Sequence, residues 1–248
     1  MDPRAVGPLL DQSGALFLRY FSHVYETPTQ FWYTACDHYC FEKLHHKVRS
    51  QIRRAYRDCR VERVDPHWMG ENGYSCVAAA VSRYPRALHD SEKEFQTKCY
   101  ASEGGPFDYW GAFIGDRLVG FSKCVVGTNY AACVIFKLDP NYLAYSPASA
   151  LQDSMLQAYV MRQHKTVFNG FRPIVHSTNM HEFLLKFGYR RVYCDLNLAY
   201  RPSVRILVSG LYRFREMFAG MSEIGWTGRI KTLLAQEEIR RSFLQART

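Results

Sequence analysis

The clearest pattern of apolar and polar positions runs from residue 107 to residue 200. Two apolar runs, 107–114 and 117–126, are joined by Gly115-Asp116, a two-residue turn of the kind favoured between antiparallel strands. A third run, 130–138, follows a turn of Gly, Thr and Asn. Short connections of this kind predict a meander of three antiparallel strands.

The chain then changes to alternating helices and strands. Residues 139–146 form a loop, and a helix begins near Pro147, because proline suits the first helical position and Ser146 can cap it. We expect a strand at 166–171, a helix at 178–188 and a last strand at 189–200.

The first hundred residues carry weaker signals. The aromatic run 31–36 predicts a strand, whereas 15–21 fits either a short helix or a short strand. Alternation at 59–65 predicts another strand. Helices follow at 68–84 and from the capping-box pattern Ser91–Glu94 to about Tyr100.

Residues 41–58 predict a basic amphipathic helix. Leu44, Val48, Ile52 and Ala55 share one face at spacings of four, four and three residues. Cations occupy the other faces, and the candidates for contacts with nucleic-acid phosphates are Arg49, Arg53, Arg54 and Arg57. The alternative is a solvated face without a partner.

Charge and composition narrow the function classes. The chain has 248 residues, a net charge of +9 and 47% hydrophobic residues, so a full core and a polyanionic partner are both expected.

Its eight cysteines form no Cys-x-x-Cys pair, and Cys36-x-His38-x-Cys40 lacks zinc-ligand spacing, so we expect free thiols and no metal. Without a signal-peptide pattern or a transmembrane run, we predict a cytoplasmic location.

The last 48 residues predict a basic helical tail. Apolar residues recur at helical spacing in 204–218 and 230–243. Nine basic and four acidic side chains give the tail more than half of the net charge. The tail could pack on the core, form a homodimer, or contact tRNA or a membrane surface.

The order of elements in 107–200 resembles the acyltransferase fold of the GNAT superfamily. Three segments are most similar to the Fem-type branch: 44–56 to its basic helix, 136–151 to its phosphate loop, and 178–189 to its fourth helix. The resemblance implies an α/β (α+β) fold with a mixed, mostly antiparallel twisted sheet flanked by helices. We expect an N-terminal extension at 1–58, a GNAT-like core at 59–200 and the tail at 201–248.

The loop before Pro147 is the expected donor site. Small residues there let a ligand approach the free N–H groups of a helix start, which bind anions; the candidates are Ser146, Ala148, Ser149 and Ala150. GNAT enzymes hold coenzyme A here with an Arg/Gln-x-x-Gly-x-Gly/Ala signature. Of that signature only Ala148 matches in this chain, so the donor stays open between acyl-coenzyme A and aminoacyl-tRNA.

Other site residues follow from the resemblance and from side-chain chemistry. Asn179 corresponds to the Asn that opens the fourth helix, near the reacting groups, and His176 could deprotonate an amine. Weaker candidates are Tyr145 for catalysis and, for substrate binding, Asn169, Arg172 and Asp195.

Three function classes remain from the sequence. The first is acyl transfer from a coenzyme A thioester to an amine-bearing small molecule or peptide. The second is aminoacyl transfer from charged tRNA, as Fem-type enzymes perform. The third is a non-catalytic binding protein on the same fold.

Overall fold

The computed structural model describes residues 3–82, 90–174, 179–219 and 225–245. The chain divides into two compact units. The core unit comprises residues 34–170 and 179–190, and the terminal unit comprises 1–33, 171–178 and 191–248. The predicted boundaries near residues 58 and 200 remain a prediction about domain organisation.

The fold class predicted from the sequence is confirmed. The strands form an eight-stranded sheet in the order β1-β8-β2-β7-β6-β5-β4-β3, and its pairs are mostly antiparallel. The strands are β1 (Phe17–Tyr25), β2 (Trp32–Cys36), β3 (Arg60–Val64), β4 (Phe107–Ile114), β5 (Arg117–Val126), β6 (Tyr130–Leu138), β7 (Thr166–Phe171) and β8 (Arg190–Tyr200). The helices are α1 (Pro3–Ser13), α2 (His46–Asp58), α3 (Pro66–Asn72), α4 (Tyr74–Val81), α5 (Glu92–Tyr100), α6 (Pro147–Leu156), α7 (Met180–Leu185), α8 (Pro202–Arg213), α9 (Arg215–Ala219) and α10 (Gly225–Gln245).

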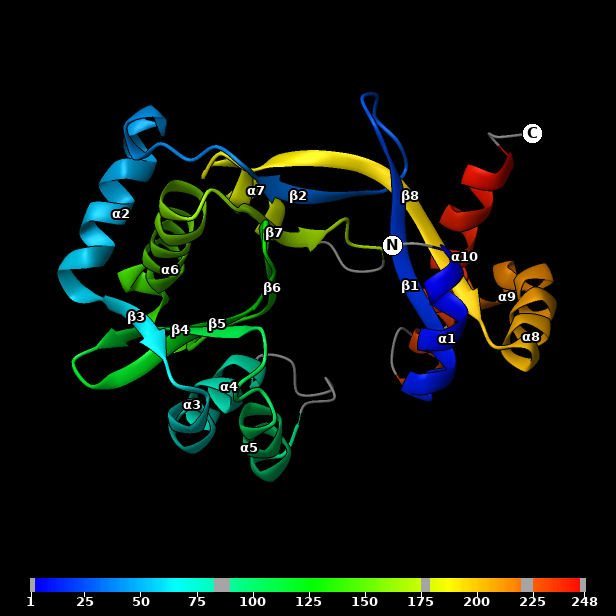
Figure 1. Ribbon diagram of the computed structural model, residues 1–248, viewed down its shortest axis with the longest axis horizontal. Coiled ribbons are helices and arrows are strands. Elements are labelled where there is room, and N and C mark those ends of the chain that lie inside the picture. The colour runs from blue at the N-terminus through cyan, green and yellow to red at the C-terminus, as the bar shows by residue number, and fades with distance from the viewer. Residues whose placement is uncertain (1–2, 83–89, 175–178, 220–224, 246–248) are drawn as a thin grey trace. The chain divides into compact units, whose positions relative to one another are not determined.

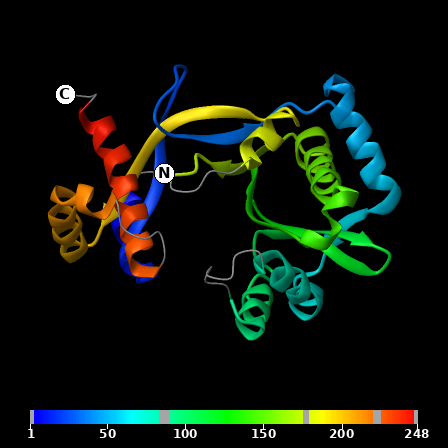
Figure 2. The ribbon, with the colours of Figure 1, turned by 180° about the vertical axis from the view of Figure 1, so that it is seen from behind.

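Helices cover both faces of β3–β6 in the core unit. Helices α2 and α6 lie on one face and α3, α4 and α5 on the other (Figures 1 and 2). Fully buried side chains such as Ile52, Leu151 and Met155 fill the first interface, and Met69 and Phe121 fill the second. Two separate apolar clusters therefore hold a three-layer core unit together.

The predicted meander is confirmed. In the β4–β5 hairpin Ile114 pairs with Arg117 around Gly115, whose φ of +57° is a turn conformation that glycine adopts without strain. A bulge between Ala112 and Phe113 shifts the register of the hairpin. Strand β6 then pairs with β5 as far as Leu138.

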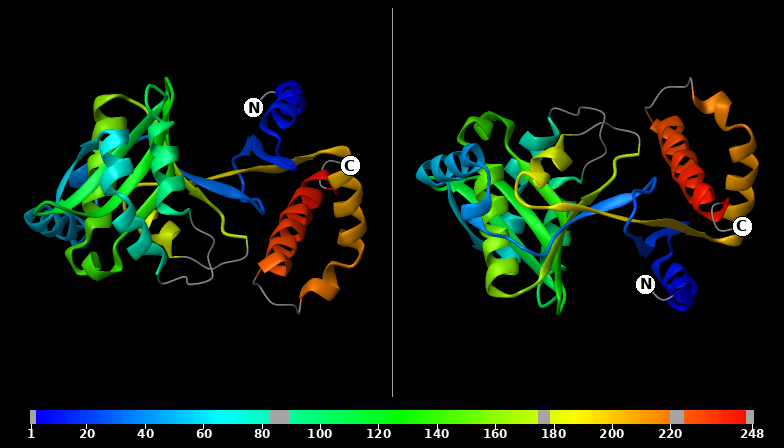
Figure 3. Two further views of the ribbon diagram at one scale, coloured as in Figure 1. Left: turned by 90° about the horizontal axis from the view of Figure 1, so that it is seen from below. Right: turned by 90° about the horizontal axis from the view of Figure 1, so that it is seen from above.

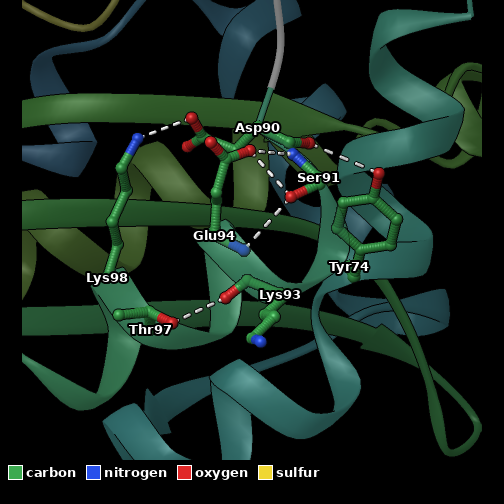
Figure 4. Close-up of polar contacts among 7 residues, drawn as sticks. All are labelled: Tyr74, Asp90, Ser91, Lys93, Glu94, Thr97 and Lys98. Atoms are coloured by element: carbon green, nitrogen blue, oxygen red, sulfur yellow. Dashed lines mark hydrogen bonds and ion pairs between the residues drawn. The ribbon is translucent and has the colours of Figure 1, made fainter.

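The capping box at the start of α5 is also confirmed. The Ser91 hydroxyl accepts the Glu94 N–H at 3.3 Å, and the Glu94 carboxylate accepts the Ser91 N–H at 2.8 Å (Figure 4). Close by, Lys98 contacts Asp90 at 2.5 Å, and the Tyr74 hydroxyl donates to the Asp90 carbonyl. The polar contacts fix the start of this helix beside α4.

Several predicted element bounds need correction. The helix expected at 41–58 begins at His46, after a short 3-10 turn at Phe41–Lys43. The helix expected at 68–84 is two helices that meet at Gly73. A Cβ atom at Gly73 would lie 2.6 Å from the Met69 carbonyl oxygen, so there is no room for a side chain there. The predicted end of this helix falls outside the described residues. The helix expected at 178–188 is shorter, α7, and its predicted first residue also falls outside them.

The terminal unit combines a two-stranded ribbon with helices. Residues 15–21 belong largely to strand β1, which settles the choice between helix and strand, and β1 pairs antiparallel with β8. The predicted helical tail is α8, α9 and α10, and α10 contacts both α8 and α9 (Figure 3). Phe31, Leu196 and Ile239 form part of its small apolar cluster.

Candidate functional site

Strands β6 and β7 separate part-way along their length. They pair in parallel from Tyr130–Thr166 to Cys133–Asn169, whereas β6 continues to Leu138 along β5. Among the described residues no strand pairs with the second half of β6 on this side. The side chain of Val134, just past the last pair, is 55% exposed. Beyond this point the backbone groups of β6 have no partner strand on this side among the described residues, and we call this break in pairing the opening.

The helix start predicted to bind the donor follows β6 directly. A 3-10 segment, Pro140–Tyr145, leads to Ser146, whose φ of 58° and ψ of 43° are left-handed. The Ser146 side chain does not cap α6, so that prediction is wrong; its Oγ accepts instead from Gln51 Nε2 at 3.4 Å. The left-handed backbone turns the carbonyl group of Ser146 towards the Ser149 N–H, at 2.9 Å.

The donor-binding candidates differ in whether their polar groups are free to bind an anion. Ser149 and Ala150 are fully buried, and both of their N–H groups donate to Ser146. No described residue accepts the Ala148 N–H, and the buried Oγ of Ser149 has no partner among them. Tyr145 is 43% exposed beside this loop. One free N–H is fewer than a pyrophosphate usually receives at a helix start.

Helix α2 packs beside this loop and carries its cations outward. It contacts α6 and the 3-10 segment before it, with Val48, Ile52 and Ala55 buried. Arg53, Arg54 and Arg57 are exposed, and Arg49 is half-buried with no described acceptor for its Nε. In the described parts of the chain, none of these four arginines pairs with an acid. Their charge therefore remains available to an anion.

Asn169 lies inside a buried polar chain below the opening. Its Nδ2 donates to Gln152 Oε1 at 3.2 Å, and Gln152 Nε2 donates to the Tyr189 hydroxyl at 2.5 Å. Thr34 donates to the carbonyl oxygen of Asn169. Burial raises the pKa of Tyr189, which keeps its hydroxyl protonated. The chain holds Asn169 in place at the last β6–β7 pair.

A second buried cluster joins α2 to α6 through Asp153. The carboxylate of Asp153 is fully buried and accepts the Tyr39 hydroxyl, the Tyr56 hydroxyl at 2.7 Å and Gln157 Nε2 at 2.7 Å. Burial and these contacts raise the pKa of Tyr39 and Tyr56. Both phenols therefore stay neutral donors, which a buried carboxylate requires.

The region after β7 holds a histidine that the sequence analysis missed. His181, on the first turn of α7, is 6% exposed, and its ring carbon lies 3.3 Å from where a Gly170 Cβ would stand. Gly170 has a φ of +78°, so backbone conformation and space both favour glycine there.

The predicted His176 lies outside the described residues. Asn179 is exposed and forms no side-chain cap.

Two predicted substrate residues belong to the terminal unit. The Arg172 guanidinium donates to the Gln30 carbonyl. Asp195 is buried and accepts the Tyr25 hydroxyl at 2.8 Å, with His23 Nδ1 at 3.3 Å. Within the core unit, α2, which carries the four arginines, contacts the 3-10 segment that contains Tyr145 and the helix α6 that begins at Pro147.

Several polar residues of these hydrogen-bonded clusters were not selected from the sequence. Gln152, Asp153 and Gln157 interrupt an otherwise apolar helix, and that interruption was a usable signal. His181 lies two residues after the selected Asn179 and could have been selected with it. Tyr39 and Tyr56 gave no such signal.

Two further findings concern metals and membranes. In the parts of the chain that the structure describes, no three His, Cys, Asp or Glu side chains gather as metal ligands would. None of the described helices combines the length and apolar character needed to span a bilayer.

Comparison with known proteins defines the fold. No protein-family model and no curated protein sequence matches this chain. It is similar to the C-terminal DUF2156 domain of a protein described as a lysylphosphatidylglycerol synthetase from Agrobacterium fabrum, with a TM-score of 0.52 and 11% identity over 82% of this chain and 68% of that one. It is also similar to FemX, with a TM-score of 0.50 and 9% identity over 75% of this chain and 66% of that one. The chain therefore has the GNAT-like fold that these structures share.

Proposed function

We propose that this chain is an acyltransferase that moves an acyl group onto an amine. The observation that carries the proposal is the separation of β6 from β7 beyond Cys133 and Asn169, directly before the helix start at Pro147. The acyltransferase fold supports it. A non-catalytic binding role is the alternative that the experiment below excludes.

The reaction needs little covalent participation from the protein. The amine nitrogen attacks the acyl carbonyl carbon, a C–N bond forms, and the C–S or C–O bond to the donor breaks. The amine loses a proton and the leaving sulfur or oxygen gains one. Unpaired backbone N–H groups of β6 are available to bind the oxyanion, and orientation of the two reactants lowers the barrier further.

Coenzyme A is one candidate donor. The start of α6 offers the Ala148 N–H, and small side chains leave room for a phosphate group. An acyl chain attached to that group would then extend into the opening beside Val134.

Charged tRNA is the second candidate, and the cations of α2 favour it. Arg53, Arg54 and Arg57 are exposed on a helix that packs against α6, and none has an acidic partner among the described residues. A row of unpaired cations suits an extended phosphate backbone better than a single pyrophosphate. The donor would then span α2 and the loop at Ser146.

Among the proton-accepting candidates we add His181 to His176. His181 is buried next to Gly170, at the end of β7 where the strands separate. An imidazole there could accept the amine proton near neutral pH. Tyr145, Asn179 and the two residues in the terminal unit remain proposals. A cytoplasmic location and a homodimer through the tail also remain predictions.

The experiment supplies two labelled donors, acetyl-coenzyme A and tRNA carrying a radiolabelled amino acid, with a mixture of polyamines, aminoglycosides and lysine-containing peptides as acceptors. Val134→Trp should fill the opening and reduce transfer about 100-fold, because a displaced substrate loses its alignment. The matched control is Met161→Trp, which changes another exposed apolar side chain of the core unit, on the segment that follows α6. Absence of transfer from either donor, or equal effects of the two variants, would contradict the proposal.

A charge variant separates the two donors. Replacing both Arg53 and Arg54 by Gln should weaken charged-tRNA binding about 10-fold and reduce its dependence on salt, since two phosphate contacts are lost. Lys93→Gln is the control, because Lys93 is exposed on α5, on the opposite face of the sheet (Figure 1). Unchanged tRNA binding in the double variant would leave coenzyme A as the donor.

A further inference from the structure

The helices of the terminal unit expose large apolar side chains after folding. Ile206 and Leu207 on α8, Phe214 at its end, Met217 on α9 and Trp226 on α10 are between 59% and 76% exposed. Helix α10 packs against α9 and α8, so these residues belong to one helical group (Figure 3). Large apolar side chains that stay exposed on packed helices commonly mark an interaction surface.

Helix α8 has two apolar faces. Val208 is 2% exposed and marks the inner face. At 100° per residue, Ile206 and Gly210 project about 160–200° away from Val208, and Leu207 and Phe214 form the next row on the outer side. A Cβ atom at Gly210 would meet nothing within 4 Å, which confirms that this side is open. The inner face is used for folding and the outer face remains uncovered.

Three exposed arginines of the same helices lack an acidic partner among the described residues. Arg205, Arg213 and Arg229 are exposed, and no described residue of opposite charge contacts any of them. The other tail arginines differ: Arg240 and Arg241 contact Glu237 at 2.7 and 2.8 Å, and Arg215 contacts Glu216 and Glu238. The acids of the described tail therefore have arginine partners, and Arg205, Arg213 and Arg229 leave uncompensated positive charge on α8 and α10.

We propose that α8, α9 and the start of α10 form a surface that docks on an anionic lipid bilayer. Apolar side chains would enter the boundary between headgroups and acyl chains, and Arg205, Arg213 and Arg229 would contact lipid phosphates. The surface lies in the terminal unit, so this inference stands apart from the acyl-transfer proposal.

Charge and apolar exposure together favour an anionic membrane over a second copy of the chain or a nucleic acid. A symmetric contact with a second copy would place the same three arginines around one interface, where like charges repel. A nucleic acid would satisfy the arginines and leave Ile206, Leu207 and Met217 in water. An anionic membrane satisfies both groups.

The test is cosedimentation of the full chain with vesicles of phosphatidylcholine and phosphatidylglycerol in a ratio of about three to one, and with pure phosphatidylcholine. We expect binding to the anionic vesicles and at least about 10-fold weaker binding to the neutral ones. The double variant Ile206→Ser/Phe214→Ser should lose about 30-fold in partitioning. Its matched control, Val24→Ser, alters a residue on β1 that is 67% exposed, and should bind like the wild type.

A second readout uses Trp226. Vesicle binding should shift its fluorescence to shorter wavelength, and Trp226→Phe identifies its share of the signal. Arg205→Glu/Arg213→Glu should remove binding while retaining the circular dichroism of the wild type. Equal binding to neutral vesicles would overturn the proposal. So would an absence of vesicle binding, or self-association in the ultracentrifuge that the Ile206→Ser/Phe214→Ser variant abolishes.

Discussion

Both units bury polar side chains, but the most exposed large apolar side chains among the described residues lie in the terminal unit. The core unit buries Gln152, Asp153 and Asn169 and gives each of them described hydrogen-bond partners. The terminal unit exposes Ile206 and Met217 to more than 70%. Satisfied buried polar groups make an interior rigid, whereas an apolar surface left exposed is available to a partner. The comparison agrees with our two proposals, which place acyl transfer in the core unit and docking in the terminal unit.

Among the polar substitutions, the largest effect should come from Asp153→Ala. The substitution leaves the buried Tyr39 hydroxyl and the Gln157 amide without their acceptor, which costs about 2–4 kcal/mol of unfolding free energy. Urea denaturation followed by circular dichroism measures the change. The control is Asp116→Ala, in the exposed β4–β5 turn, with a change within about 0.5 kcal/mol. Similar losses in the two variants would mean that the Asp153 cluster does not stabilise the core unit.

An intermediate effect is expected from Glu237→Gln in the terminal unit. Burial alone would raise the pKa of Glu237, but hydrogen bonds from Arg240 and Arg241 outweigh it and lower the pKa. Loss of the charge should cost about 1–2 kcal/mol near pH 7. The control is Glu238→Gln, since the side chain of Glu238 is 61% exposed.

The same residue predicts a dependence on pH. A carboxyl group with a lowered folded pKa stabilises the protein above its unfolded pKa of about 4.3, and that stabilisation is lost as the pH falls through the folded pKa. Wild type and Glu237→Gln should therefore differ at pH 7 and converge in acid. Denaturant titrations from pH 7 to pH 3 test this. If the difference in unfolding free energy between wild type and variant stayed constant over this range, the contacts of Glu237 with the arginines would not be its cause.

The smallest effect should come from Phe214→Ser. This side chain is 59% exposed, so its replacement should change the unfolding free energy by less than about 0.5 kcal/mol. Phe121→Ala, at a fully buried position of the core unit, should cost about 3–5 kcal/mol by the same denaturation assay. A comparable loss at Phe214 would show that the outer face of α8 contributes to folding rather than to docking.

The strands were predicted from sequence more accurately than the site was. The bounds of β4, β5, β6 and β7 matched because short apolar runs and, between β4 and β5, a Gly-Asp turn define them locally. The break at Gly73 and the left-handed Ser146 depend on tertiary contacts that no local pattern encodes. The contacts of Asp153 with Tyr39 and Tyr56 join positions about 100 residues apart, so only the fold brings them together.

The most direct test of the acyl-transfer account is hydrogen exchange with and without each donor. Saturating acetyl-coenzyme A or charged tRNA should slow amide exchange in the peptides that cover 134–138 and 146–151, where β6 leaves β7 and α6 begins. Charged tRNA should also protect the side of α2 that carries Arg53 and Arg54. Protection confined to other segments, or none with either donor, would contradict the account.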